Sequence, residues 1–135
     1  MEYGYHDYKK VHIWVGNNFD EGYHSYFELD YNLDIDIESL EYKICGFCKD
    51  VGKKWYDEDW LGAFQHPKPV SLDILLEEVS VSSDVLDNIK RICKEKGFIQ
   101  ANAMFWYYDG NLVVSDKEKL YNNLVYIGVF DAPTL

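Results

Sequence analysis

Residues 11–16 have the sequence VHIWVG, in which aliphatic residues alternate with His12 and Trp14. Alternation of this kind is typical of a β-strand, because successive side chains point to opposite faces of a sheet. The Gly-Asn-Asn run that begins at Gly16 predicts the turn that ends the strand. We therefore take this strand as the element from which the fold is assembled.

The segment after this turn predicts two helices separated by one ambiguous stretch. Aromatic residues recur at helical spacing over residues 20–29, where Asp20 is a candidate N-cap. Over residues 30–41 apolar and acidic residues alternate, which favours a strand with one solvent-exposed face. A second helix is expected over residues 42–52, with Gly52 as its C-terminal stop.

The second half of the chain predicts further helices and then strands. Two prolines indicate a loop at residues 66–69. Serine caps predict a short helix that begins after Ser71 and a longer one that begins at Ser82 or Ser83 and is closed by Gly97. The remaining apolar segments predict strands at 98–108, 112–114 and 124–130, the first two joined by an Asp-Gly hairpin turn.

Together these elements predict an α+β fold, with a mixed, largely antiparallel sheet packed against about four short helices. The length of 135 residues is typical of one domain. We expect a single domain over residues 1–135, in which residues 1–9 form a loose N-terminal extension. Because the chain is 47% hydrophobic and 17% aromatic, some aromatic rings are expected on the surface or in a groove.

The chain is strongly acidic, with a formal net charge of -11. Such a surface repels phosphate, so nucleic acid is not expected as a partner, whereas a basic protein is favoured. Residues 1–67 carry 14 acidic and 6 basic residues, against 10 and 7 in residues 68–135. Eight acidic residues lie from Asp20 to Glu41, with no lysine or arginine among them. The acidic surface is therefore expected in the first half of the chain.

The cysteines and the N-terminal sequence indicate the cellular location. Three cysteines are an odd number, which does not match a secreted disulfide framework. The N-terminus lacks the basic start and apolar run of a signal peptide, and no stretch has the apolar length of a membrane span. We expect a cytoplasmic protein without a membrane partner.

Cys45 and Cys48 form a C-x-x-C motif, which thiol oxidoreductases place at a helix N-terminus just after a strand. Here the pair is expected inside the helix over residues 42–52, without a βαβ unit around it, so a structural role is favoured over a redox role. Zinc is not predicted, because Cys93 stands alone and the four histidines are scattered. No cofactor and no metal ligand is assigned.

Residues 30–41 also resemble a calcium-binding loop in their spacing. Oxygen ligands fall at loop positions one, three, five, seven, nine and twelve. Position six needs glycine for a sharp turn, and Ile35 stands there instead. A calcium-binding module is an alternative interpretation of this segment, beside a solvated acidic strand or loop.

The acidic run at residues 57–59 is flanked by aromatic residues and leaves two interpretations open. Asp57, Glu58 and Asp59 could serve a small metal-dependent hydrolase, which would need carboxylates that face one cleft. A solvated turn with aromatic anchors is favoured, because three adjacent carboxylates do not readily face one point. The chain has no glycine-rich phosphate loop and no G-x-S-x-G motif, and no catalytic residue is assigned.

Three motifs occur in a familiar order: a W-x-G strand, an F-x-x-D-x-G helix end and a Y-D-E-D turn. The positions are Trp14, Gly16, Phe47, Asp50, Gly52, Tyr56, Asp57, Glu58 and Asp59. This combination resembles the immunity protein 22 family of bacterial polymorphic toxin systems, over most of residues 10–130. The resemblance implies a cytoplasmic antidote, not an enzyme, that binds and neutralises a toxin delivered by a neighbouring cell. It also implies that the toxin gene lies beside the gene for this chain.

Many such toxins are nucleases, whose active sites are often basic because they hold phosphate. An acidic surface rich in aromatic residues can occupy a basic site of this kind, with the aromatic side chains as binding hot spots. The predicted partner-binding residues are Asp30, Asp34, Asp36, Glu38, Tyr56, Asp57, Glu58, Asp59 and Trp60.

Overall fold

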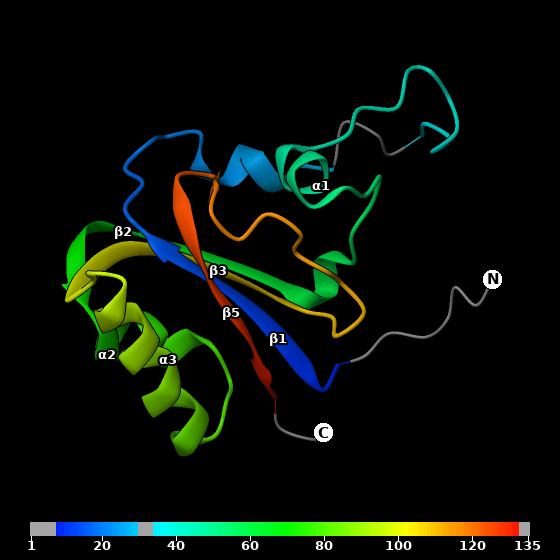
Figure 1. Cartoon of the computed structure of the whole chain (residues 1–135). Helices are drawn as coiled ribbons and strands as arrows, with labels where there is room; N and C mark the ends of the chain where they lie inside the picture. Colours follow the sequence, from blue (N-terminus) through cyan, green and yellow to red (C-terminus); the bar gives the residue numbers. More distant parts are fainter. Residues whose placement is uncertain (1–7, 30–33, 133–135) are drawn as a thin grey trace.

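The computed structural model describes residues 8–29 and 34–132 and has an α+β architecture. Five strands form one antiparallel sheet in the order β2-β3-β1-β5-β4. The strands are β1 (Lys10–Gly16), β2 (Leu61–Ser71), β3 (Gln100–Tyr108), β4 (Leu120–Tyr121) and β5 (Leu124–Asp131). Helices α2 (Leu72–Leu75) and α3 (Ser83–Glu95) lie on one side of the sheet and α1 (Gly46–Val51) on the other (Figure 1). The predicted fold class is confirmed.

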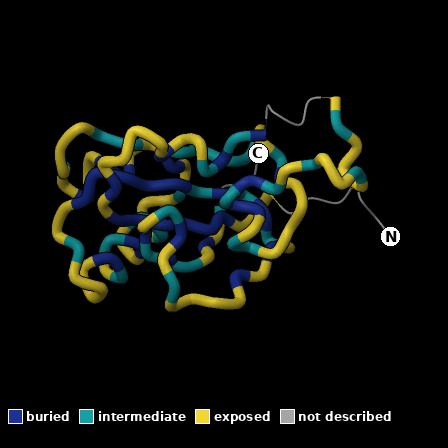
Figure 2. The backbone as a smooth tube through the Cα atoms, turned by 90° about the horizontal axis from the view of Figure 1, so that it is seen from above, coloured by how far each residue is buried: buried dark blue, intermediate teal, exposed yellow. Residues whose placement is uncertain are grey.

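Strand β1 is the centre of the sheet, paired with β3 on one side and with β5 on the other. Its residues from Val11 to Gly16 are all buried, and none of them is an acidic residue, a lysine or an arginine. Trp14 pairs with Phe105 of β3 and Tyr126 of β5. The strand predicted at residues 11–16 is therefore confirmed. Seen from above, buried segments run through the middle of the molecule and exposed segments surround them (Figure 2).

One face of the sheet, which we call the aromatic face, is packed with large rings. Trp14 lies at its centre, stacked on Phe105 with 4.5 Å between ring centroids and in edge contact with Phe47. The cover consists of α1, the short 3-10 helix η1 (Tyr23–Phe27) and parts of the chain without regular structure. Its buried residues include Trp14, Tyr23, Phe27, Phe47, Tyr56, Phe105, Tyr107, Tyr121 and Tyr126.

The opposite face, which we call the aliphatic face, packs against α2, α3 and the 3-10 turn η4 (Leu76–Glu78). Ile13 of β1 meets Leu75 and Ile89 of these helices in one buried cluster. The serine caps are confirmed: the Ser71 hydroxyl accepts from the Ile74 N–H, and Ser82 caps α3 in the same way. Among the described residues α3 is the longest helix, with 13 residues, and none has the length and apolar character needed to span a membrane.

Three predictions for the first half of the chain are wrong in detail. The helix expected over residues 20–29 is only the 3-10 helix η1, which no side chain caps. The helix expected from residue 42 begins at Gly46, although Gly52 ends it in the left-handed conformation as predicted. The part of the expected strand that the structure describes, residues 34–41, consists of turns. The turns form because side chains here bond the backbone two residues ahead, in place of a strand partner.

Strand β2 was not predicted, because its middle reads as a proline loop. It pairs with β3 from Leu61 to Gln65 and again from Val70, with a register shift between them. Residues 66–69, which were predicted as a loop, instead belong to β2 and form the stretch that has no paired residue in β3. Proline is tolerated here because β2 is an edge strand of the sheet.

The strand expected at residues 112–114 is also absent, since the structure has no strand there. A turn does follow β3, and in this turn the Leu112 N–H donates to the Asp109 carbonyl at 3.2 Å. Leu112 and Val114 then enter the aromatic face as buried side chains. The hairpin partner of β5 is instead β4, through Asn122 and Asn123, whose φ angles are 53° and 67°.

Candidate functional site

Residues 34–45, here called the acidic loop, project from the aromatic side of the molecule beside α1 (Figure 1). Asp34, Asp36 and Glu38 are exposed on it, as predicted. The loop has a defined backbone, because the Ser39 N–H bonds the Asp36 carbonyl at 2.8 Å. The Asp36 carboxylate accepts a further bond from the Glu38 N–H at 2.9 Å. The carboxylates are thus carried on ordered turns.

Apolar side chains stand among these carboxylates. Leu40 is fully exposed and Trp55, on the adjoining segment, is 54% exposed. The Tyr42 hydroxyl ties the loop to that segment by donating to the Lys54 carbonyl at 2.7 Å. The loop therefore offers both charge and apolar contact area, which is the composition expected of a protein-binding surface.

Asp30, the remaining predicted residue of this region, lies outside the described residues. Within residues 8–29 and 34–132 no three His, Cys, Asp or Glu side chains are placed to hold a metal ion together. The calcium-binding and metal-dependent hydrolase interpretations therefore gain no support from this part of the chain.

The second predicted region, residues 57–60, is here called the acidic turn and contains the 3-10 helix η3 (Glu58–Trp60). Asp57 is its N-cap, because its carboxylate accepts a bond from the Asp59 N–H at 3.1 Å. Glu58 and Asp59 are exposed and Trp60 is half-buried. The three carboxylates thus have different environments, and Asp59 lines the pocket described below.

Tyr56 was predicted at the binding surface, but it lies in the core and is 3% exposed. Its ring meets Phe47 edge-on, and its hydroxyl donates to the Phe27 carbonyl. Burial raises the pKa of Tyr56 far above its usual value. The aromatic character of the segment, which suggested a hot spot, instead anchors the acidic turn to the sheet.

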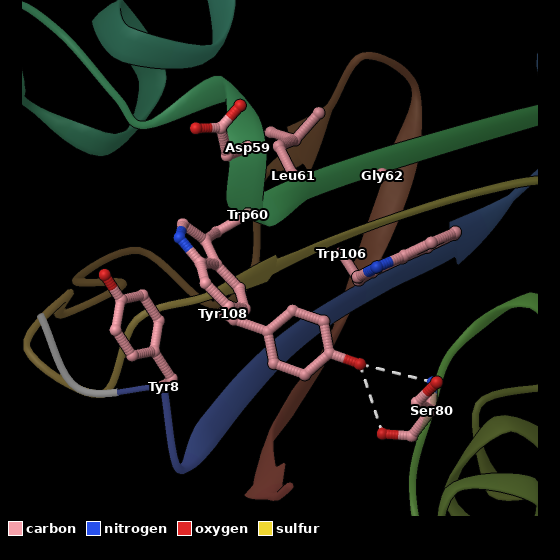
Figure 3. Close-up of a pocket in the computed structure, with 8 residues that line it drawn as sticks. All are labelled: Tyr8, Asp59, Trp60, Leu61, Gly62, Ser80, Trp106 and Tyr108. Atoms are coloured by element: carbon pink, nitrogen blue, oxygen red, sulfur yellow. Dashed lines mark hydrogen bonds between the residues drawn. The ribbon is translucent and has the colours of Figure 1, made fainter. Parts of the chain in front are cut away.

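A pocket of about 370 Å³ opens beside the acidic turn, where the helices leave the sheet uncovered (Figure 3). Its wall is aromatic. The rings of Tyr8 and Trp60 lie 4.0 Å apart between centroids, and Trp60 meets Tyr108 edge-on at 6.2 Å. Trp106 of β3 and Leu61 of β2 complete the apolar wall.

Gly62 determines where the Trp106 ring can lie. A Cβ atom at Gly62 would fall 2.1 Å from Cζ2 of Trp106, so any side chain there would displace the indole. Tyr108 is fixed from the other side, because its hydroxyl donates to the Ser80 carbonyl at 3.1 Å and accepts from the Ser80 N–H at 3.2 Å (Figure 3). Burial raises the pKa of the Tyr108 hydroxyl, so it stays protonated.

Sequence reasoning found Asp59 and Trp60 of this pocket but missed Trp106, Tyr108 and Gly62. The available signal was alternation in the strand at 98–108, which places Trp106 and Tyr108 on one face. Nothing local could show that Gly62 lies opposite Trp106, because that pairing depends on the register between β2 and β3.

The C-x-x-C pair was expected inside a helix, but only Cys48 lies within α1. Cys45 is the N-cap of α1, and the Cys48 N–H bonds its sulfur at 3.4 Å. The hydrogen bond from the Cys48 thiol lowers the pKa of Cys45 to about 7, while the same bond and burial raise the pKa of Cys48. Both residues are buried, at 1% and 0% exposure, and the described residues directly before the pair, 34–44, form no strand. The helix position favours redox chemistry, but burial keeps a second reactant away.

The remaining motif residues have structural roles. Phe47 fills the aromatic face between Trp14 and Tyr107. Asp50 accepts from the Tyr26 hydroxyl at 2.6 Å and from Lys119 Nζ at 3.2 Å, which ties α1 to η1 and to the segment before β4. Gly16 lets β5 come close, since a Cβ there would lie 3.1 Å from Cα of Leu124.

His12 is a buried polar residue at the edge of the aromatic face. Its Nε2 lies 3.0 Å from the Asp109 carbonyl and must donate, so Nδ1 accepts from the Tyr126 hydroxyl at 2.8 Å. Burial lowers the pKa of His12, although the Asp109 carbonyl opposes the shift. The ring is therefore neutral near pH 7 and joins β1, β5 and the turn after β3.

Comparison with known proteins gives one match. The family model described as Immunity protein 22 matches residues 11–132 of the 135-residue chain. The match confirms the resemblance inferred from the three motifs. No curated protein and no solved structure matches the chain.

Proposed function

The chain belongs to the immunity protein 22 family, and we propose that it binds and neutralises a cognate toxin through the acidic loop and the acidic turn. The match over residues 11–132 is the observation that carries the toxin-binding role. The exposure of Asp34, Glu38, Glu58 and Asp59 supports the choice of surface. The protein acts by binding, in the cytoplasm of the cell that it protects.

Charge indicates the kind of toxin that this surface fits. With a net charge of -11, the chain attracts a basic protein over the last nanometre of approach and repels an acidic one. A nuclease toxin has such a basic region at its active site. Occupation of that region by carboxylates blocks access of nucleic acid without any chemical change to the toxin.

The experiment uses the toxin domain encoded beside the gene for this chain. Calorimetry should show a tight complex, and excess chain should abolish toxin activity in a cleavage assay. Because the contact is between opposite charges, raising salt from 0.05 to 0.5 M should slow association far more than it speeds dissociation. A neighbouring toxin that stays fully active at saturating chain would contradict the proposal.

The surface assignment needs a separate test. Asp34 and Asp59 suit charge reversal, because in the described part of the chain no backbone N–H bonds their carboxylates. The double variant Asp34→Lys with Asp59→Lys should weaken the complex by about tenfold or more, since reversal replaces attraction by repulsion. The matched control is Asp87→Lys with Glu118→Lys, two exposed positions in the second half of the chain that give the same change in charge.

The two pairs of variants distinguish surface contact from a general charge effect. If the control weakens the complex as much as Asp34→Lys with Asp59→Lys, only net charge matters and no surface is assigned. If neither pair changes an established complex, the acidic loop and turn do not meet the toxin.

A further inference from the structure

The pocket beside the acidic turn has a composition that selects its occupant. Among the residues that the structure describes, four aromatic side chains and one carboxylate line it, and no lysine or arginine does. We propose that this pocket receives an arginine side chain of the toxin. The inference rests on the toxin-binding function proposed above and names the chemistry that one part of the surface recognises.

The aromatic rings suit a flat cation. A guanidinium group is planar and stacks on the faces of tryptophan and tyrosine, where the ring quadrupole attracts positive charge. Trp60 and Tyr8 lie 4.0 Å apart at an interplanar angle of 34°, and Tyr108 stands nearly perpendicular to Trp60 at 72°. Because Tyr8 and Trp60 cover one face of each other, a guanidinium group would stack on an outer face of these rings. The volume of about 370 Å³ lies near the lower end of ligand pockets and suits one side chain rather than a large ligand.

The negative charge of the Asp59 carboxylate favours a cationic occupant. An apolar occupant would leave this carboxylate without a partner. Asp59 lies next to Trp60 at the rim, so a guanidinium stacked on the ring can also donate hydrogen bonds to the carboxylate. Arginine can make two such bonds in a fixed plane, whereas lysine offers a compact point charge that stacks less well. An anionic occupant is excluded by Asp59 and by the acidic field of the whole chain.

The pocket is already shaped before binding. Gly62 leaves room for the Trp106 indole, and the two bonds between Tyr108 and Ser80 hold the ring beside it. Rings that are ordered in advance lose little entropy when a partner arrives. This is a requirement for a side chain that anchors a protein complex.

The test is a double-mutant cycle between this chain and the toxin. On this side the variants are Asp59→Asn, which keeps the shape and removes the charge, and Trp60→Leu, which removes the ring. Each should weaken the complex about tenfold, as the loss of a desolvated cation–aromatic contact predicts. One toxin arginine, changed to Ala, should give the same loss, and combining it with either variant should add little. The toxin change Arg→Lys should restore only part of the affinity.

Asp87→Asn is the matched control for Asp59→Asn, since it removes an exposed carboxylate that does not line the pocket. It should bind the toxin within about threefold of the wild type, because the pocket is left unchanged. If Trp60→Leu does not fold, Asp59→Asn decides the outcome, because its carboxylate is exposed and its loss leaves the core unchanged.

The outcomes separate this inference from the proposed function. A wild-type complex that is indifferent to Asp59→Asn and Trp60→Leu overturns the arginine pocket and leaves toxin binding intact. Coupling of the pocket variants to an apolar toxin side chain, and to no arginine, also overturns it. Failure of the wild-type chain to bind the toxin overturns the proposed function itself.

Discussion

The two faces of the sheet differ in how they are covered. The 13-residue helix α3, together with the short α2 and η4, covers the aliphatic face, and most backbone groups of α3 bond within the helix. A six-residue helix, a 3-10 turn and irregular segments cover the aromatic face, so many backbone groups there need partners from side chains. Tyrosine meets this need, since its ring packs in the core while its hydroxyl reaches the backbone. The difference suggests that the aromatic face depends on single contacts more than the aliphatic face does.

The tyrosine bonds on the aromatic face join distant segments. The Tyr23 hydroxyl of η1 donates to the Met104 carbonyl of β3 at 3.0 Å. The Tyr107 hydroxyl accepts from the Asp57 N–H at 3.0 Å, which fixes the start of the acidic turn. A local bond of the same kind runs from the Tyr121 hydroxyl to the Asp116 carbonyl, five residues earlier, at 2.6 Å. The acidic turn is thus held in place by the core that lies behind it.

The largest expected effect comes from removing a ring at the centre of the aromatic face. Phe47→Ala should lower the free energy of unfolding by about 3–5 kcal/mol, because it leaves a cavity among six other rings. Leu75→Ala, the corresponding loss on the aliphatic face, should cost about 2–5 kcal/mol. Denaturant unfolding measures both changes.

The two cavities should differ in their local consequences. In Phe47→Ala, limited proteolysis should cut first around α1 and the acidic loop, because Phe47 holds α1 to the sheet. If these segments resist proteolysis equally in Phe47→Ala and Leu75→Ala, the aromatic face unfolds as cooperatively as the aliphatic face.

A smaller effect is expected from removing single hydroxyls. Tyr23→Phe leaves the Met104 carbonyl without that buried partner and should cost about 1–3 kcal/mol. Tyr108→Phe, on the aliphatic side, breaks bonds to the exposed Ser80, whose backbone water can solvate, and should cost less than about 1 kcal/mol. The comparison is made by thermal and denaturant unfolding. Equal losses for the two variants would remove the special role assigned to buried tyrosine hydroxyls.

The pH dependence of stability tests another buried polar group of the aromatic face. The folded pKa of His12 is lowered by burial, so below the unfolded value of 6.5 the unfolded chain binds more protons at this site than the folded chain. Stability from His12 is therefore complete above pH 6.5 and is lost as the pH falls from there towards the folded pKa. The slope from this one group is at most about 1.4 kcal/mol per pH unit.

The control for this measurement is His12→Gln, which cannot titrate. The difference in unfolding free energy between wild type and His12→Gln, measured from pH 7.5 to 5, isolates the histidine from the many carboxylates. A difference that does not change with pH would show that His12 has the same pKa in both states.

The sequence predicted a secondary-structure element correctly where the pattern that specifies it lies within the segment itself. The alternation in β1 and the serine cap and apolar spacing of α3 are local, and both elements form as expected. Strand β2 was missed because Pro67 and Pro69 suggest a loop, and only pairing with β3 makes its ends extended. The alternation at residues 34–41 predicted a strand that has no neighbour to pair with, so turns form instead.

The residues of the candidate site also differ in whether the sequence alone could predict their positions. Asp34, Asp36, Glu38 and Asp59 could be placed on the surface from charge alone, because exposed carboxylates need no partner. The burial of Tyr56 could not be inferred, since it depends on Phe47 and Phe27 from other segments. The pocket likewise depends on strand register, which a single sequence does not reveal.

A small effect is also expected on the aliphatic face, where a serine caps the long helix α3. Ser82→Ala removes the bond at 3.3 Å between the Ser82 hydroxyl and the Val85 N–H and should cost about 1 kcal/mol in unfolding free energy. Ser82→Asp keeps an acceptor and places a negative charge at the positive end of α3, so it should be at least as stable as wild type at low salt. A loss for Ser82→Ala as large as that for Tyr23→Phe would mean that the helical cover depends on single contacts as much as the aromatic one does.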